Sequence, residues 1–210
     1  MIIQESTMTT RAVFHSDAHR LLLEKVWLPE GRKASICMSN AGKMPNIYHM
    51  DYTTLFTVNA LSALDFGSVS IVNLFSRMTN KLNLSSNLDD LTCPENHKQI
   101  LTVAEACDVF ILAIGSVTDT YRKVRPYRDK IFQLLAPFQD KVHVIENEAG
   151  QRGLHPLSPS LRNKPWTLVP FALLQPEPPT ELRQSDTNNA TSPATRKPRK
   201  NAGSTTSPTV

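Results

Sequence analysis

The sequence predicts an α/β domain, in which a central and mainly parallel sheet lies between two layers of helices. Four short apolar runs have the length and the β-branched content of buried strands, and they lie at residues 34–38, 69–72, 109–114 and 142–145. The intervals between these runs are long enough for helices. Alternation of strand and helix along a chain is typical of a three-layer α/β/α fold with right-handed crossovers.

The first interval carries a clear helical pattern. Apolar residues recur at three-residue steps at Leu55, Val58, Leu61 and Leu64, and Asp51 precedes them as a suitable N-cap. We therefore predict a helix that starts after Asp51 and connects the first two strands.

Two further helices are predicted between the later strands. Thr92 and Glu95 match a capping box with Pro94 in the first turn, so a helix is expected to run on to Ala106. A third helix is expected over residues 129–135, before Pro137. Residues 19–27 are open to two interpretations, an amphipathic helix or an edge strand, because their apolar periodicity does not decide between them.

The composition changes near residue 174. Beyond it prolines alternate with Ser, Thr and Asn, large apolar residues are scarce, and a basic run extends over residues 196–200. Such a segment buries too little apolar surface to offset the entropy of ordering. We expect one α/β domain over residues 1–174 and a disordered basic tail over 175–210, which either solubilises the protein or attracts phosphate.

Several classes of protein are disfavoured. The formal net charge of +4 permits an anionic partner without requiring one. Cys37, Cys93 and Cys107 are too few for a disulfide framework, a four-cysteine zinc site or an iron–sulfur cluster. The histidines show no HExxH spacing, and no P-loop follows a strand, so we expect no metal and no cofactor. No signal peptide and no apolar run long enough to span a membrane is present, and we expect a cytoplasmic monomer.

Polar residues follow each predicted strand, at the edge where an open α/β sheet binds ligands. The amide, imidazole, guanidinium and aromatic groups among them are those that a nucleobase pocket uses for hydrogen bonds and stacking. In chain order these residues are Asn40, Asn73, Phe75, Arg77, Gly115, His155 and Ser158.

These residues belong to motifs that resemble a known family. Residues 73–79 read NLFSRMT, Asp89-Asp90 and Pro94-Glu95-Asn96 follow, and Ile114-Gly115 and then His155-Pro156-Leu157 come later. In this order they resemble an uncharacterised bacterial and phage domain family with NLFxxRxT, DDPxGPEN, WG and HPLY motifs. The resemblance covers roughly residues 18–171.

The order of landmarks is also similar, more distantly, to the uracil-DNA glycosylase superfamily. That resemblance implies a water-positioning role for Asn40, base recognition by Asn73, a strand-end glycine at Gly115, and a histidine near the leaving base at His155, followed by Ser158. The first loop reads Ser-Asn-Ala-Gly and lacks the Asp-Pro-Tyr of the uracil enzymes. Uracil and a bulkier or modified base therefore both remain open as the substrate.

The residue types suit this chemistry. Cleavage of an N-glycosidic bond builds positive charge on the sugar and negative charge on the base, so it needs held water and donors at the base. Asn40 is expected to orient the water, with Asp51, Asp89, Asp90 or Glu95 as candidate assisting carboxylates. His155 is expected to donate to the base, Asn73 to pair with its edge, Phe75 to stack on it and Arg77 to bind phosphate.

Each assignment has a structural alternative. Asp51 also suits a helix cap, Asn73 a strand-end turn, His155 a loop anchor, Phe75 the core and Arg77 a solvated charge. The predicted function is a metal-independent DNA glycosylase that flips a modified or damaged base from duplex or single-stranded DNA, in repair or in defence against phage. The alternatives are an enzyme of the same fold that acts on free nucleotides or nucleosides, and a non-catalytic nucleic-acid-binding module.

Overall fold

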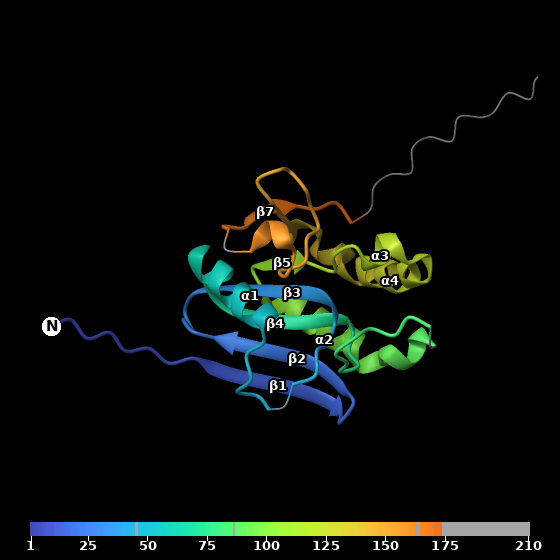
Figure 1. Ribbon diagram of the computed structural model, residues 1–210, viewed down its shortest axis with the longest axis horizontal. Helices are drawn as coiled ribbons and strands as arrows, with labels where there is room; N and C mark the ends of the chain where they lie inside the picture. The colour runs from blue at the N-terminus through green and yellow to red at the C-terminus, as the bar shows by residue number, and fades with distance from the viewer. Residues whose placement is uncertain (45, 86, 163, 174–210) are drawn as a thin grey trace, which may run out of the picture. The chain divides into compact units, whose positions relative to one another are not determined.

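The computed structural model describes residues 1–44, 46–85, 87–162 and 164–173. These residues form a seven-stranded sheet in the order β1-β2-β4-β3-β5-β6-β7, and Figure 1 shows its first five strands side by side in this order. The strands are β1 (Thr9–Ser16), β2 (His19–Val26), β3 (Arg32–Asn40), β4 (Phe66–Phe75), β5 (Val109–Leu112), β6 (Val142–Glu146) and β7 (Thr167–Pro170). The boundary and tail expected over residues 175–210 lie outside the described residues.

The helices fill the intervals that the sequence assigned to them. The α-helices are α1 (Tyr52–Ala63), α2 (Pro94–Ala106), α3 (Val117–Thr120) and α4 (Arg125–Leu135), and the 3-10 helices are η1 (Leu88–Leu91), η2 (Arg122–Val124), η3 (Ala136–Lys141) and η4 (Pro159–Leu161). None of the helices in the described ranges has both the length and the apolar character needed to cross a membrane.

The prediction of a mainly parallel sheet is wrong for the sheet as a whole, which is mixed. Only the central strands β4, β3, β5 and β6 run parallel to one another. The outer strands β1, β2 and β7 pair in antiparallel fashion. The short connection between β1 and β2, at Asp17-Ala18, permits only an antiparallel hairpin. Of residues 19–27, His19–Val26 form the strand β2, and because β1 lies outside it, β2 is not an edge strand.

Helices cover both faces of the sheet, because each face presents its own apolar cluster. On one face Val58 and Leu61 of α1 pack with Ile36 and Ile71. On the other face α2 and α4 pack against Cys37, Val72 and other strand residues. Successive side chains of a strand point to opposite faces of the sheet, so each central strand contributes apolar residues to both clusters.

Two helix starts differ from their predictions. The capping box at Thr92 is absent: Cys93 is the N-cap of α2 and makes no capping hydrogen bond with its side chain. Thr92 Oγ1 instead accepts a 3.5 Å hydrogen bond from Asn96 Nδ2. Helix α4 begins at Arg125 rather than at Asp129, with a proline in its first turn. The cap predicted at Asp51 is confirmed, since Asp51 Oδ1 accepts a 2.7 Å hydrogen bond from the Thr54 N–H.

The strand order reverses at β3, which has β4 on one side and β5 on the other, although β4 and β5 both follow it in the chain. In open α/β sheets such a switch point leaves a crevice beyond the carboxyl ends of the strands, because the crossover connections leave it in opposite directions. The fold therefore directs attention to the ends of β3, β4 and β5.

Candidate functional site

A cavity of about 550 Å³ opens at this switch point. Its walls come from the carboxyl ends of β3 and β4, the turns after β3 and β5, the start of α1 and the loop around His155. Five residues expected from the sequence line it together, although they lie far apart in the chain: Asn40, Asp51, Asn73, Gly115 and His155.

A hydrogen bond from its own loop fixes the ring of His155. The Leu157 N–H donates a 3.2 Å hydrogen bond to His155 Nδ1, so Nδ1 is the unprotonated nitrogen and Nε2 carries the proton. Burial lowers the pKa of His155, and the negative charge of Asp51 opposes this shift more weakly. The site therefore holds a neutral imidazole whose Nε2–H makes no hydrogen bond with any described residue and can donate to a ligand.

Gly115 makes the close approach of this histidine possible. Its φ of +71° lies in the left-handed region, and a Cβ added there would lie 3.2 Å from His155 Cβ. A side chain at this position would be strained and would press on the histidine. The glycine at the end of the apolar run thus has a geometric role in the cavity wall.

Asn73 places an unpaired amide in the cavity. Its side chain is only 2% exposed, and it forms no hydrogen bond with any described residue. Its backbone carbonyl accepts a 2.9 Å hydrogen bond from Asn96 Nδ2 of α2, which ties the strand end to the helix. The Asn73 amide is not among the inaccessible unpaired atoms of the described residues, so it reaches the cavity and is a candidate for binding a ligand.

Asn40 and Asp51 stand at the other wall. Asn40 Nδ2 donates to the Thr79 carbonyl at 3.2 Å, and its Oδ1 accepts from Ser39 Oγ at 3.2 Å. The amide is therefore fixed in orientation, with one lone pair of Oδ1 left over. Asp51 uses Oδ1 for the cap of α1, and its Oδ2 lies beside Gly42, 3.6 Å from where a Cβ of that residue would be.

Sequence reasoning missed Arg20, which also lines the cavity. The residue is 6% exposed, and its Nε is buried without a hydrogen-bond partner in the described part of the chain. Burial lowers the pKa of its guanidinium, and Asp51 opposes the shift. The sequence did not indicate a role for Arg20, because a basic residue directly before an apolar run is usually a solvent-exposed residue at the start of a strand.

Three predicted residues do not line the cavity. Phe75 is fully buried in the core on the other face, with its ring centroid 5.4 Å from that of Tyr127, so it cannot stack on a base. Arg77 is exposed, and its Nη1 donates to the Asp90 carbonyl at 3.4 Å. Ser158 turns the chain after the histidine, since its N–H donates to the His155 carbonyl at 2.8 Å.

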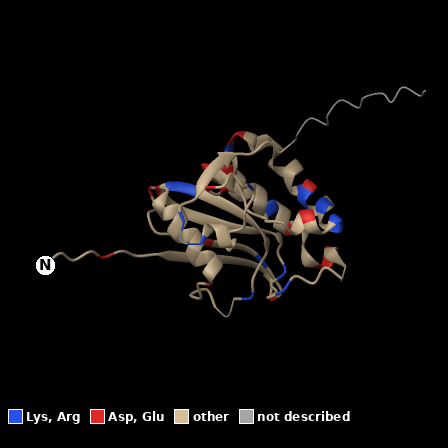
Figure 2. Cartoon of the chain, turned by 45° about the horizontal axis from the view of Figure 1, so that its top comes forward, with Lys and Arg blue, Asp and Glu red and all other residues tan. Residues whose placement is uncertain are grey.

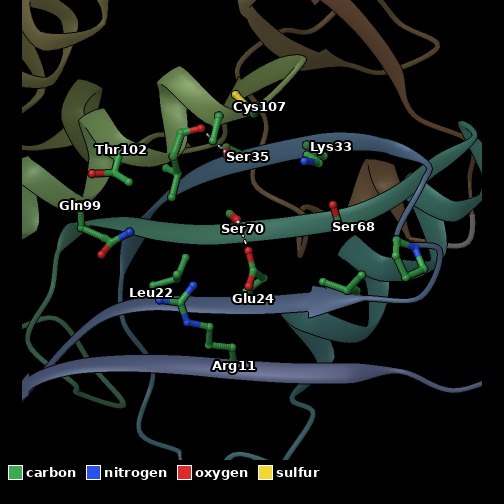
Figure 3. Close-up of a pocket in the computed structure, with 15 residues that line it drawn as sticks. Arg11, Leu22, Glu24, Lys33, Ser35, Ser68, Ser70, Gln99, Thr102 and Cys107 are labelled. Atoms are coloured by element: carbon green, nitrogen blue, oxygen red, sulfur yellow. Dashed lines mark hydrogen bonds between the residues drawn. The ribbon is translucent and has the colours of Figure 1, made fainter.

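A second hollow, of about 390 Å³, lies on the opposite face of the sheet (Figure 3). Its floor is near the amino ends of β3 and β4, at Ser35, Ser68 and Ser70. Two of these hydroxyls are already paired: Ser70 Oγ donates to Glu24 Oε1 at 3.3 Å, and Ser35 Oγ donates to the Val103 carbonyl at 3.1 Å. We therefore place the candidate site in the cavity at the carboxyl ends.

The charged side chains of the described residues form neither a metal-binding cluster nor a region of one sign. Figure 2 shows Lys and Arg spread over helices, strands and loops and interspersed with Asp and Glu. Within the described ranges, no three His, Cys, Asp or Glu side chains are grouped so that they could hold a metal ion. The three cysteines are free thiols, and burial raises the pKa of Cys37 to about 12.

Comparison with known proteins places the chain in a family. No curated protein and no protein of solved structure matches it. A family model described as "Protein of unknown function (DUF1643)" matches residues 20–157, which include every residue of the candidate cavity. The match extends over more than half of the chain, and the protein therefore belongs to the DUF1643 family.

Proposed function

We propose that this protein is a DNA glycosylase, which hydrolyses the N-glycosidic bond of a flipped modified or damaged base and leaves an abasic site. The observation that carries the proposal is the meeting of Asn40, Asp51, Asn73 and His155 at one cavity. These are the groups that the chemistry requires, namely a water-positioning amide, a carboxylate, a base-reading amide and a neutral donor.

In this proposal Asn40 and Asp51 bind the water at one wall of the cavity, and His155 binds the departing base at the other. The oxygen of water attacks C1′ of the sugar, the C1′–N bond breaks, and its electron pair leaves with the base. Asn40 Oδ1 accepts a hydrogen bond from the water, and Asp51 Oδ2 receives its proton. The Nε2–H of His155 donates a hydrogen bond to the departing base, where a preorganised donor is worth about 3 kcal/mol of barrier.

Asn73 supplies the recognition of the base. Its amide offers one acceptor and two donor hydrogens, and it is the group that a pyrimidine or purine edge can pair with in the same plane. Because Asn73 forms no side-chain hydrogen bond with the described residues and its amide reaches the cavity, its donor and its acceptor are both available to a base. Among the described residues, no Phe, Tyr or Trp lines the cavity, so stacking is expected to contribute less than the sequence suggested.

The test is incubation of the purified protein with duplex and single-stranded DNAs that carry uracil, damaged bases and phage-type modified cytosines. Abasic sites, scored by alkaline cleavage, are expected on one of these substrates. His155→Ala and Asn73→Ala should abolish them, whereas Ser70→Ala, in the hollow on the other face, should not. Absence of abasic sites on every substrate contradicts the proposal.

A second candidate function is an enzyme that acts on free nucleotides. The specific observation in its favour is Arg20, a buried cation inside the cavity rather than on a surface track for a DNA backbone. The dispersed charges of the surface also suit a small anionic substrate (Figure 2). Release of a free base from a nucleotide, with no activity on DNA, would favour this candidate.

A further inference from the structure

Arg20 is a buried cation that lines the candidate cavity and forms no ion pair with any described residue. We propose that Arg20 binds a phosphate group of the substrate inside this cavity, either a phosphodiester of DNA or the phosphate monoester of a free nucleotide. The inference rests on the proposed function in one respect, since it takes the ligand of the cavity to be a nucleotide unit.

The burial of Arg20 is the first argument. The residue is 6% exposed, and its Nε is inaccessible and without a partner among the described residues. Its side chain makes one hydrogen bond, a long one of 3.7 Å from Nη1 to the sulfur of Met44. Arginines are almost never fully buried unless they are paired with an anion, because an uncompensated charge loses its hydration. The protein thus retains a charged group at a cost that a ligand would remove.

The charge of the cavity is the second argument. Asp51 is the acidic residue of the lining, and it lies beyond the 4.0 Å limit of an ion pair with Arg20. Its carboxylate already accepts the capping hydrogen bond of α1. Lys43 adds a second cation at the exposed rim of the cavity. The lining therefore has an excess of positive charge, which attracts an anionic ligand.

The geometry of the guanidinium is the third argument. The buried Nε does not face a ligand, but Nη2 forms no hydrogen bond with any described residue and is not among the inaccessible unpaired atoms, so the Nη end of the planar guanidinium is available to the oxygens of a phosphate. The cavity is also larger than a base alone requires, and Asn73 supplies a separate polar group for the base edge. One ligand that satisfies both unpaired groups is a base joined to a sugar phosphate.

The experiment measures thermal unfolding at constant ionic strength, with inorganic phosphate replacing chloride. Phosphate is expected to raise the Tm of the wild-type protein and of Arg11→Gln, an equal charge change at an exposed residue on the other face (Figure 3). Arg20→Met should show a smaller rise, because it retains only the general stabilisation that phosphate gives through its exclusion from protein surfaces. Its Tm without phosphate should equal or exceed that of the wild type, because the variant removes an uncompensated buried charge. A wild-type Tm that does not respond to phosphate, or an equal rise in Arg20→Met, overturns the inference.

Two ligand series distinguish the sources of the phosphate. If the source is a free nucleotide, deoxynucleoside 5′-monophosphates bind more tightly than the matching deoxynucleosides, and Arg20→Met weakens only the former, by about ten- to a hundredfold. If the source is DNA, the same loss appears with a single-stranded dodecamer and not with the monophosphates. Arg20→Lys should recover part of the affinity in either case, because it restores the charge without the planar guanidinium.

The outcomes separate this inference from the proposed function. Arg20-dependent phosphate binding without removal of any base supports the anion site and contradicts the glycosylase. Removal of a base at an equal rate by the wild type and Arg20→Met, with equal phosphate responses, supports the glycosylase and overturns the role of Arg20.

Discussion

The backbone N–H of Leu157 donates a 3.2 Å hydrogen bond to Nδ1 of His155, two residues earlier in the chain. An N–H can donate to this nitrogen only while the nitrogen carries no proton, so the bond selects the tautomer with the proton on Nε2. A proton on Nδ1 would face the Leu157 N–H, so that two donors would meet without an acceptor between them. Burial lowers the pKa of His155 as well, with a smaller contrary effect from the charge of Asp51. The two effects together maintain a neutral imidazole at the cavity.

This arrangement predicts how activity and stability depend on pH. Activity should be constant around neutral pH and should fall on acidification only below pH 6.5, the ordinary value from which the pKa is lowered. Between pH 6.5 and the lower pKa of the folded state, His155 binds a proton in the unfolded chain but not in the folded protein. The contribution of His155 therefore lowers the free energy of unfolding progressively as the pH falls through this range. A pH–rate profile and an NMR titration of the imidazole test the first statement.

Comparison with His155→Gln tests the second statement. His19 and His97 also have pKa values lowered by burial, and they contribute acid sensitivity of their own. The difference between the wild type and the variant in unfolding free energy against pH isolates His155. An acid limb of activity above pH 6.5, or an equal acid sensitivity of the two proteins, contradicts the neutral imidazole.

Gly115→Ala should impair the cavity more than a matched glycine substitution elsewhere. Gly150 has a similar φ of +76°, but a Cβ added there meets nothing within 4 Å. Gly150→Ala should therefore cost about 1 to 2 kcal/mol of stability from backbone strain and leave activity unchanged. Gly115→Ala adds contact with His155 at 3.2 Å, and it should lower both stability and activity. Denaturant unfolding and the abasic-site assay make the comparison, and equal activity in the two variants would show that Gly115 does not position His155.

The central strands were predictable because they are buried on both faces. Runs such as residues 109–114 are apolar throughout, since α1 covers one face and α2 and α4 the other. Strands β1 and β7 lie at the edges, where half of each strand meets solvent and the apolar signal is lost. The antiparallel pairing of β2 depends on its neighbours in space, which the sequence of β2 alone does not contain.

The site was predictable for residues that line the cavity at the ends of the buried strands, such as Asn40 and Asn73, and was not predictable for Phe75 and Arg20. Period-two alternation would put Asn73 and Phe75 on one face, yet Leu74 and Phe75 both pack in the core behind α2. Arg20 was not predicted, because its burial arises from Met44 and other groups far along the chain. Local sequence reports the type of a side chain, and tertiary packing decides whether that side chain reaches the cavity.

Phe75→Leu tests this reassignment of Phe75. The substitution removes the ring that packs against Tyr127, at a centroid distance of 5.4 Å, and it should cost about 1 kcal/mol of stability. Binding of a base in the cavity should not change, because the Phe75 side chain packs in the core and does not line the cavity. Denaturant unfolding measures the first effect, and titration with oligonucleotides measures the second. A selective loss of base binding with unchanged stability would restore the stacking role.

Asp51 combines a structural and a chemical role, and two substitutions separate them. Asp51→Asn keeps an oxygen that can accept the 2.7 Å hydrogen bond from the Thr54 N–H, so stability should change by only a few tenths of a kcal/mol. It removes the carboxylate that receives the proton of water, so the rate should fall by about 10² to 10⁴. Asp51→Ala should lose the same rate and about 1 kcal/mol of stability as well.

Asn87 provides the matched control for the cap. Its Oδ1 accepts a 3.2 Å hydrogen bond from the Asp89 N–H at the start of η1, outside the cavity. Asn87→Ala should therefore lower stability without an effect on the rate of base removal at a temperature where the protein is folded. If Asp51→Asn retains the full rate, Asp51 acts as a helix cap alone, and Asn40 is left to orient water without a carboxylate. If the rate falls while the cap is intact, the reaction needs the charge of the carboxylate, either to receive the proton of water or to act on His155, and the pH–rate profile of Asp51→Asn distinguishes the two roles.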